Sequence, residues 1–199
     1  MKIYLELQEP IKKNYPTERI RAVTYETIEN RFPNPSQIFT DSSKFRNSTA
    51  AGLWIPEVNH KEGWKIEGGD NITIMSAEFL AINKALEWAT LNSEFLDKRE
   101  LVILSDSRSS LEALKSTATS KYSSQEEHAY RITEILQERN FSISPQWVPS
   151  HIGLAGNEAV DNIAKDAHAL PTTIPCPLSI EEDKKVIKKS SNSVLADDV

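Results

Sequence analysis

Four acidic residues occupy comparable positions along the chain and together could bind divalent metal ions. Two of them directly follow short apolar runs and two lie near the starts of predicted helices; they are Asp41, Glu78, Asp106 and Asp161. Clustered carboxylates repel one another and raise each other's pKa, so a cation that neutralises the group favours their convergence. Oxygen ligands with room for waters and a phosphate oxygen suit Mg²⁺, and two such ions can hold the attacking water and the leaving oxygen of a phosphodiester.

The stretch Trp147–Ala167, WVPSHIGLAGNEAVDNIAKDA, carries one of these acids and several other polar residues without an evident packing role. A short strand leads into it, a glycine-containing loop carries His151, and a helix follows with Asn157 as its predicted N-cap. An acid in the first turn of this helix, as predicted for Asp161, gains from the helix dipole and stays ionised. A capped surface helix explains Glu158 and Asp161 equally well, so this stretch alone leaves both interpretations open.

Composition and charge limit the class of protein. The formal net charge is −6, and hydrophobic residues make up 39% of the 199 residues, enough for a core. An acidic chain lacks the basic excess by which many proteins bind nucleic-acid phosphates, so metal ions would have to mediate such contact. The single cysteine, Cys176, excludes an internal disulfide and fits a reducing compartment. Neither a signal core nor a membrane-spanning run is visible, so we expect a soluble monomer inside the cell, in the cytoplasm or the nucleus, without membrane contact.

The predicted elements alternate as in an α/β domain. Their order, βββαβααβα, implies a five-stranded mixed sheet with helices on both faces. The predicted strands cover residues 37–40, 50–58, 63–66, 101–104 and 143–148. The predicted helices cover residues 76–91, 107–115, 126–139 and the segment that begins at Asn157. Ligand sites in open α/β sheets form beyond strand ends, where loops and helix starts meet, so the four acids could converge there.

Prolines divide the chain into three predicted parts. Residues 1–35 are a lead-in segment with a short helix around Thr17–Glu29, and two prolines close it. Residues 36–170 form the predicted domain. Residues 171–199 form a polar, flexible tail that starts with three prolines, and its lysines fit a solvated tail better than a nuclear import signal.

Four short motifs, in order, make the chain resemble the type 1 ribonuclease H family from Gln37 to Ala169. The family's Thr-Asp-Gly-Ser motif appears as Thr40–Ser43, and its Ala-Glu helix start appears in Ser76–Ile82. Its strand-ending Asp-Ser matches Leu104–Ser107, and the pattern Trp-Val-x-x-His-x-Gly-x-x-Gly-Asn-Glu-x-x-Asp is complete over Trp147–Asp161. Each short match is weak alone, whereas four in order with fitting spacing are specific.

The resemblance implies a ribonuclease H-like fold and a role for each site residue. The expected ligands of two Mg²⁺ ions, with Mn²⁺ as an alternative metal, are Asp41, Glu78, Asp106 and Asp161. His151, in a mobile loop, would assist proton transfer or product departure, since histidine titrates near neutrality. Glu158 would have a supporting role near the metals. The expected substrate contacts are Ser43, Thr73 and Asn157, and the histidines without a matching family position, for which surface or structural roles are favoured, are His60, His128 and His168.

Several features depart from the family's pattern. The motif glycine is Ser42 here, which is compatible with metal binding and is expected to change the close approach of the backbone to substrate. Polar residues that touch the minor groove of the hybrid in cellular members are replaced by Ile74 and Met75, and segment 115–126 lacks the basic insertion of some bacterial members. With the serine-rich run 105–110 and no evident N-terminal hybrid-binding module, the chain looks most like the RNase H domain of a non-LTR retrotransposon polyprotein. A reverse transcriptase domain of the same polyprotein is then a candidate partner.

The leading hypothesis is an Mg²⁺-dependent endonuclease that cuts the RNA strand of RNA–DNA hybrids by a two-metal-ion mechanism. The family leaves a 5′-phosphate on the downstream RNA fragment, and minor-groove contact with 2′-hydroxyls would give selectivity for RNA. One alternative is another nuclease or an integrase of the same fold, which the contiguous His151–Asp161 spacing disfavours. The other is a catalytically silent domain used for packing or partner binding in a retroelement polyprotein, which the intact set of acids disfavours.

Overall fold

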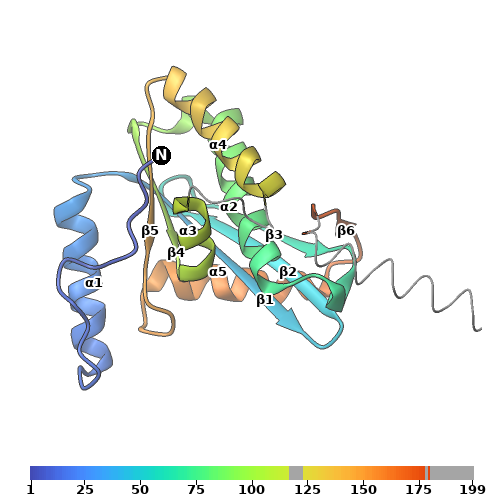
Figure 1. The fold of residues 1–199 in the computed structure, drawn as a ribbon, viewed down its shortest axis with the longest axis horizontal. Helices are drawn as coiled ribbons and strands as arrows, with labels where there is room; N and C mark the ends of the chain where they lie inside the picture. The colour runs from blue at the N-terminus through green and yellow to red at the C-terminus, as the bar shows by residue number, and fades with distance from the viewer. Residues whose placement is uncertain (117–122, 178, 180–199) are drawn as a thin grey trace, which may run out of the picture.

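Six strands pair into one mixed sheet in the computed structural model, which describes residues 1–116, 123–177 and 179 (Figure 1). The strands are β1 (Ser36–Phe45), β2 (Ser48–Ile55), β3 (His60–Ile66), β4 (Glu100–Ser105), β5 (Ser142–Trp147) and β6 (Thr173–Ile174). Their order across the sheet is β5-β4-β1-β2-β3-β6. The β1–β2 and β2–β3 pairs are antiparallel, and the other pairs are parallel.

Helices cover both faces of the sheet, which confirms the predicted α/β class. The helices of the described residues are α1 (Thr17–Arg31), α2 (Ile74–Leu91), α3 (Arg108–Lys115), α4 (Ser123–Glu138) and α5 (Ala155–Asp166). Along β1, Ile38 joins the core that α2 and α4 cover, whereas Phe39 joins the core that α1 and α5 cover. Successive side chains of a strand point to opposite faces, so the apolar run Leu101–Leu104 of β4 supplies both cores. None of these helices is both long and apolar enough to cross a bilayer.

The prediction of five strands was wrong by one short strand. β6 pairs with β3, and the Glu67 amide donates to the Ile174 carbonyl over 2.8 Å. The strand lies between prolines and is too short for an alternating pattern to reveal it. Residues at the beginning of the predicted tail 171–199 therefore belong to the folded domain, and Cys176 is buried. The rest of that predicted tail, apart from residues 175–177 and 179, lies outside the described residues.

The predicted lead-in segment 1–35 packs against the domain. Its helix, α1, ends at Arg31 rather than at the predicted Glu29. Before α1, Tyr4 forms a parallel bridge with Gln146 of β5, and the Tyr4 amide donates to the carbonyl of Pro145 over 2.9 Å. The segment thereby covers the β5 edge of the sheet, whose backbone groups would otherwise be open to other chains.

Close packing brings α5 against β1 and β2. A Cβ atom at Gly156 would lie 2.2 Å from the Phe39 ring, and one at Gly52 would lie 3.1 Å from the Ala164 amide nitrogen. Glycine permits both approaches because it has no side chain. The two glycines thus permit the close approach of α5 to the sheet.

Candidate active site

Parallel pairing of β1 and β4 sets Asp41 beside Asp106. The register pairs Thr40 of β1 with Ser105 of β4, and the next residue after each of them is an aspartate. Asp106 follows β4 directly, as predicted. The prediction that β1 ends at Asp41 was wrong, because residues 42–45 continue the strand in an antiparallel pair with β2. This polar part of the strand carries no apolar alternation from which its pairing could be predicted.

Glu78 completes a group of three carboxylates. One ligand oxygen each from Asp41, Glu78 and Asp106 lie within 4.8 Å of one another. The sequence predicted Glu78 in the first turn of its helix. Because α2 begins at Ile74, Glu78 lies in the second turn instead. The three side chains come from a strand, a helix and a loop that are far apart in the sequence, so the fold rather than the local sequence brings them together.

Burial raises the pKa of all three acids, and repulsion within the group adds to this effect for Asp41 and Glu78. Burial, and then the charge of Asp106, raises the pKa of Asp41 to about 8. Burial first, and the charge of Asp41 second, raise the pKa of Glu78 well above its ordinary value. Burial also raises the pKa of Asp106, against the opposing effects of Asn157 and His151. A divalent cation among these groups would favour their ionised forms and remove the repulsion.

The hydrogen bonds of the cluster leave an oxygen for a cation. The Ser42 amide donates to Asp41 Oδ1 over 2.7 Å, and the Ser42 hydroxyl donates to Glu78 Oε1 over 2.5 Å. Glu78 Oε2 is buried and has no hydrogen-bond partner among the described residues. Buried polar atoms without a partner are rare in folded proteins, and a ligand role explains this one. The residues therefore fit Mg²⁺ or Mn²⁺, both of which prefer oxygen ligands.

Asp161, the fourth predicted ligand, lies outside the group of three. Its Oδ2 accepts a hydrogen bond from Lys165 Nζ over 2.6 Å, one turn further along α5. The sequence predicted Asp161 in the first turn of its helix. Because α5 begins at Ala155, Asp161 lies in the second turn instead. It is still within electrostatic reach of the cluster, since its charge helps to raise the pKa of Asp41 and of Asp106.

Asn157 is not the N-cap of α5 that the sequence predicted. The N-cap is Leu154, and Asn157 is a buried residue of the first turn. Its amide Nδ2 donates to Asp106 Oδ2 over 3.2 Å. A donor to a carboxylate favours the ionised form, so Asn157 opposes the burial that raises the pKa of Asp106. Asn157 thus supports an acid of the cluster.

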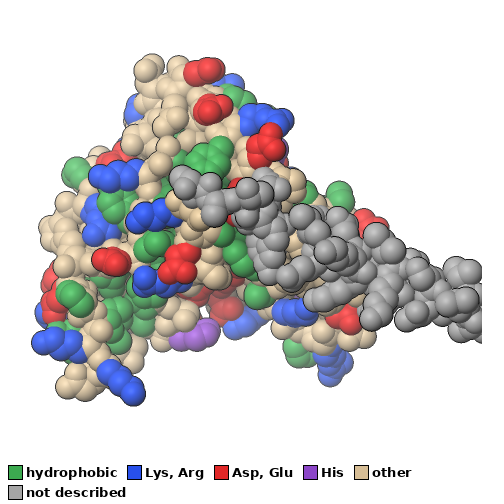
Figure 2. Space-filling model, viewed as in Figure 1, with side chains coloured by type: hydrophobic (Ala, Val, Ile, Leu, Met, Phe, Trp, Pro, Cys, Tyr) green, Lys and Arg blue, Asp and Glu red, His purple; other side chains and the backbone are tan. Residues whose placement is uncertain are grey.

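His151 is exposed on the loop between β5 and α5. Its backbone φ of 54° lies in the left-handed region, which residues other than glycine rarely adopt. Its charge lowers the pKa of Asp106, so the imidazole is within electrostatic reach of that carboxylate. Figure 2 shows histidine and acidic side chains on the same face of the molecule. The loop presents the His151 imidazole to solvent within electrostatic reach of Asp106.

The other two residues predicted to contact substrate have protein partners. Ser43 Oγ lies 3.1 Å from His168 Nε2, whose other ring nitrogen lies 2.8 Å from Ser48 Oγ. Thr73 Oγ1 accepts from the Ser76 amide over 3.1 Å and so caps α2. Either hydroxyl would have to share or exchange these bonds in order to contact a phosphate.

A comparison with protein families now identifies the chain. The RNase H family model matches residues 33–169, which include all three clustered acids and His151. The chain belongs to the RNase H family. No curated protein sequence matches it.

Solved RNase H structures resemble this RNase H chain at low sequence identity. RNase H1 from the halophilic archaeon Halobacterium salinarum is 22% identical over 67% of this chain and 97% of its own, with a TM-score of 0.50. The RNase H domain of rv2228c from Mycobacterium tuberculosis is 18% identical over 67% of this chain and 94% of its own, with a TM-score of 0.49. LC11-RNase H1, solved in complex with RNA/DNA hybrid, is 22% identical over 66% of this chain and 97% of its own, with a TM-score of 0.49. The Halobacterium structure supports an RNase H fold for this chain.

Three contacts of this RNase H domain were not predicted from sequence. Ser42 stands in place of the motif glycine, but nothing in the sequence predicts its bond to Glu78. The pair of Asp161 and Lys165 has the i, i+4 spacing typical of helical ion pairs, so this spacing could have revealed it. No sequence pattern indicated the contacts of His168, because its serine partners lie in the distant β1–β2 hairpin.

Proposed function

We propose that this RNase H-family chain is an endonuclease that hydrolyses the RNA strand of RNA–DNA hybrids with divalent metal ions. The observation that carries the proposal is the approach of Asp41, Glu78 and Asp106 to within 4.8 Å. Their raised pKa values mean that the folded chain holds these carboxylates together against desolvation and repulsion. A cation-binding role accounts for that arrangement, whereas packing alone would be better served by apolar side chains.

The three clustered carboxylates would hold Mg²⁺, with Mn²⁺ as an alternative, and Asp161 would join them as the fourth ligand. Two bound ions would supply an activated water and stabilise the leaving oxygen of the phosphodiester. Asp161 must first leave Lys165, whose side chain is 55% exposed. Because the ammonium end of this pair is open to water, a divalent cation can compete with it for the Asp161 carboxylate.

Residues around the acids would set their orientation and move protons. Ser42 and Asn157 donate hydrogen bonds to the clustered carboxylates and hold them in place. His151, exposed within electrostatic reach of Asp106, would accept or release a proton during the reaction or assist product departure. Its position on a loop open to solvent supports this role, because the proton must be exchanged with water.

A catalytically silent domain is the second candidate function. The observation that favours it is the 2.6 Å contact between Asp161 and Lys165, which withdraws one expected ligand from the cluster. Such a domain would be retained for packing or for binding a partner. It would show neither cleavage nor a stabilising response to Mg²⁺.

We also infer an origin in a retroelement polyprotein, with a reverse transcriptase domain as the partner. Support comes from the departures at Ser42, Ile74 and Met75 from the pattern of cellular members. Ile74 begins α2 and is 46% exposed, so it presents an apolar surface near the cluster. A reverse transcriptase reading frame joined to this sequence in its genome would support the inference, and an isolated gene would contradict it.

Cleavage assays separate these possibilities. A labelled RNA–DNA hybrid, a DNA duplex and an RNA duplex of one sequence are incubated with the chain in Mg²⁺, Mn²⁺ or a chelator. We expect cuts in the RNA strand of the hybrid alone, with both metals and not with the chelator. The variant Asp97→Asn removes an exposed acid that precedes β4, whereas Asp106 follows the other end of this strand; it serves as a control and should cleave normally. No hybrid cleavage at any metal concentration supports the silent domain, and cleavage of either duplex indicates another nuclease.

A further inference from the structure

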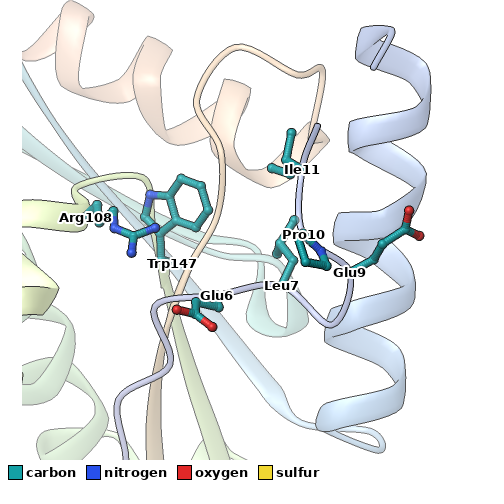
Figure 3. A pocket seen from close by; sticks show the side chains of 7 residues that line it. All are labelled: Glu6, Leu7, Glu9, Pro10, Ile11, Arg108 and Trp147. Atoms are coloured by element: carbon teal, nitrogen blue, oxygen red, sulfur yellow. The ribbon is translucent and has the colours of Figure 1, made fainter. Parts of the chain in front are cut away.

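A pocket of about 400 Å³ lies between the end of β5, the start of α3 and the N-terminal segment (Figure 3). Trp147, the last residue of β5, and Arg108, the first residue of α3, line one side of it. Leu7, Pro10 and Ile11 of the N-terminal segment line the other side. The pocket is open to solvent and large enough for one nucleoside.

Two of the lining residues donate hydrogen bonds to the backbone of Asp106, an acid of the cluster. Trp147 Nε1 donates to the backbone carbonyl of Asp106 over 3.1 Å, and the Arg108 amide donates to the same oxygen over 2.9 Å. The pocket therefore adjoins the residue whose carboxylate faces Asp41 and Glu78. A nucleic-acid strand with a phosphate at the cluster could place a neighbouring nucleotide in the pocket.

The side formed by Trp147 and Arg108 suits a planar ring. The Arg108 guanidinium carbon lies 5.3 Å from the centroid of the Trp147 ring. Indole rings and guanidinium planes are the groups on which proteins stack unpaired bases. Trp147 is only half-buried, and the Arg108 side chain is 46% exposed, so both remain accessible from the pocket.

The opposite side favours an uncharged ring over a bare phosphate. Ile11 is 36% exposed and offers apolar surface. Glu6 and Glu9 also line the pocket, but the Glu9 carboxylate points away toward α1 (Figure 3). A carboxylate in the lining repels phosphate but accepts hydrogen bonds from the amino groups of bases. Glu9 is held by Tyr15 and Arg19, each over 2.6 Å, so Glu6 offers the acceptor.

We propose that this pocket is a subsite for an unpaired nucleobase of a single-stranded tail that adjoins the hybrid. The subsite rests on the proposed nuclease function, because the hybrid at the acid cluster brings the tail to it. One wall consists of residues 6–11, which precede the segment 33–169 that matches the RNase H family. The subsite is thus a feature that the N-terminal segment adds to the family domain.

Kinetics with tailed substrates test the subsite. The Michaelis constant is measured for a blunt hybrid and for hybrids with a short unpaired tail on the RNA strand or on the DNA strand. We expect the hybrid whose tail enters the pocket to have a Michaelis constant about tenfold lower than that of the blunt hybrid, the usual effect of stacking one base. The two tailed substrates show which strand supplies the base. Equal constants for blunt and both tailed hybrids would overturn the proposal.

A matched pair of variants locates the effect. Ile11→Asp places a carboxylate in the apolar wall, and Ile135→Asp makes the same change on α4 at a residue of nearly equal exposure, 37%. We expect the ratio of blunt to tailed Michaelis constants to fall to about one in Ile11→Asp and to stay about ten in Ile135→Asp. An unchanged ratio in Ile11→Asp would contradict the assignment.

Photo-crosslinking provides a readout that needs no cleavage. A hybrid with a thiouridine in its RNA or DNA tail is irradiated with the wild-type chain, and the attached peptide is identified by mass spectrometry. We expect attachment to Trp147 or to residues 6–11, and its loss in Ile11→Asp. Attachment elsewhere, or none, overturns the subsite. Crosslinking at this pocket without any hybrid cleavage would instead sustain the subsite and refute the proposed nuclease activity.

Discussion

The Ser42 hydroxyl donates a hydrogen bond to Glu78 Oε1 over 2.5 Å, from the position where the family motif has glycine. The amide of the same residue donates to Asp41 Oδ1 over 2.7 Å. One residue of β1 therefore holds two of the three clustered acids. With Oε1 engaged, Glu78 keeps Oε2 as the buried oxygen that has no partner among the described residues. Ser42 thus orients Glu78 for a cation.

We predict that Ser42→Gly weakens cation binding about tenfold, because a hydrogen bond to a charged group contributes about 1.5–3 kcal/mol. The melting temperature of the variant should rise less than that of the wild type at each Mg²⁺ concentration, since the gain in stability follows from binding. Ser42→Thr keeps the hydroxyl and should retain most of the response. Equal Mg²⁺ titrations for wild type and Ser42→Gly would show that the hydroxyl has no such role.

Asp106→Asn should lower the rate of hybrid cleavage by about 10²–10³, since it removes a charge and a ligand while keeping the shape of the side chain. Without metal, the variant should melt at the same temperature as the wild type or higher, because one source of repulsion in the cluster is lost. With millimolar Mg²⁺ it should gain less stability than the wild type. Cleavage assays and thermal melts, with Asp97→Asn as the control, measure these effects.

A helix-capping role for Asp106 predicts the opposite result. Asparagine caps a helix nearly as well as aspartate, so activity and the Mg²⁺ response would then survive in Asp106→Asn. The structure does not favour this alternative, because the N-cap of α3 is Ser107 and Asp106 Oδ2 accepts from Asn157. Retained activity in the variant would still refute the metal-site assignment.

The stability of the metal-free protein should fall as the pH rises from about 4 to about 8. The pKa of Asp41 is about 8 in the folded protein against an ordinary value of 3.8, so ionisation is harder in the folded state. A carboxyl group with a raised pKa stabilises the fold at low pH, and this contribution is lost as the pH rises through the folded pKa. Melting temperatures of wild type and Asp41→Asn in chelator should therefore converge at low pH, with the wild type less stable at high pH. A constant difference across this range would contradict the raised pKa.

Truncations should show where the folded domain ends. A chain that stops after Ser179 should keep its melting temperature and activity, because the deleted residues are too polar to bury much surface. A chain that stops after Leu170 loses β6, the buried Cys176 and the Pro177 carbonyl that accepts from Gln125. Its melting temperature should drop by several degrees. Equal melting temperatures for the two truncations would show that β6 adds no stability.

Sequence patterns predicted the α/β class, and the three clustered acids are among the four that these patterns singled out. The apolar run of β4 showed a strand buried on both faces, because such a run has no solvent-facing positions. Asp41 and Asp106 could be placed near each other because each follows a run of this kind, and parallel strands deliver such residues to one edge of the sheet. Local burial and periodicity therefore carried this part of the prediction.

Only the tertiary structure decided which partners the polar side chains take. The bond from Asn157 to Asp106 depends on how the first turn of α5 packs beside the end of β4. The bond from Ser42 to Glu78 depends on how β1 and α2 meet, and the wall formed by residues 6–11 depends on where the N-terminal segment docks. Sequence patterns report whether a side chain is buried, but a hydrogen bond between distant elements requires atomic distances that only the packed fold establishes.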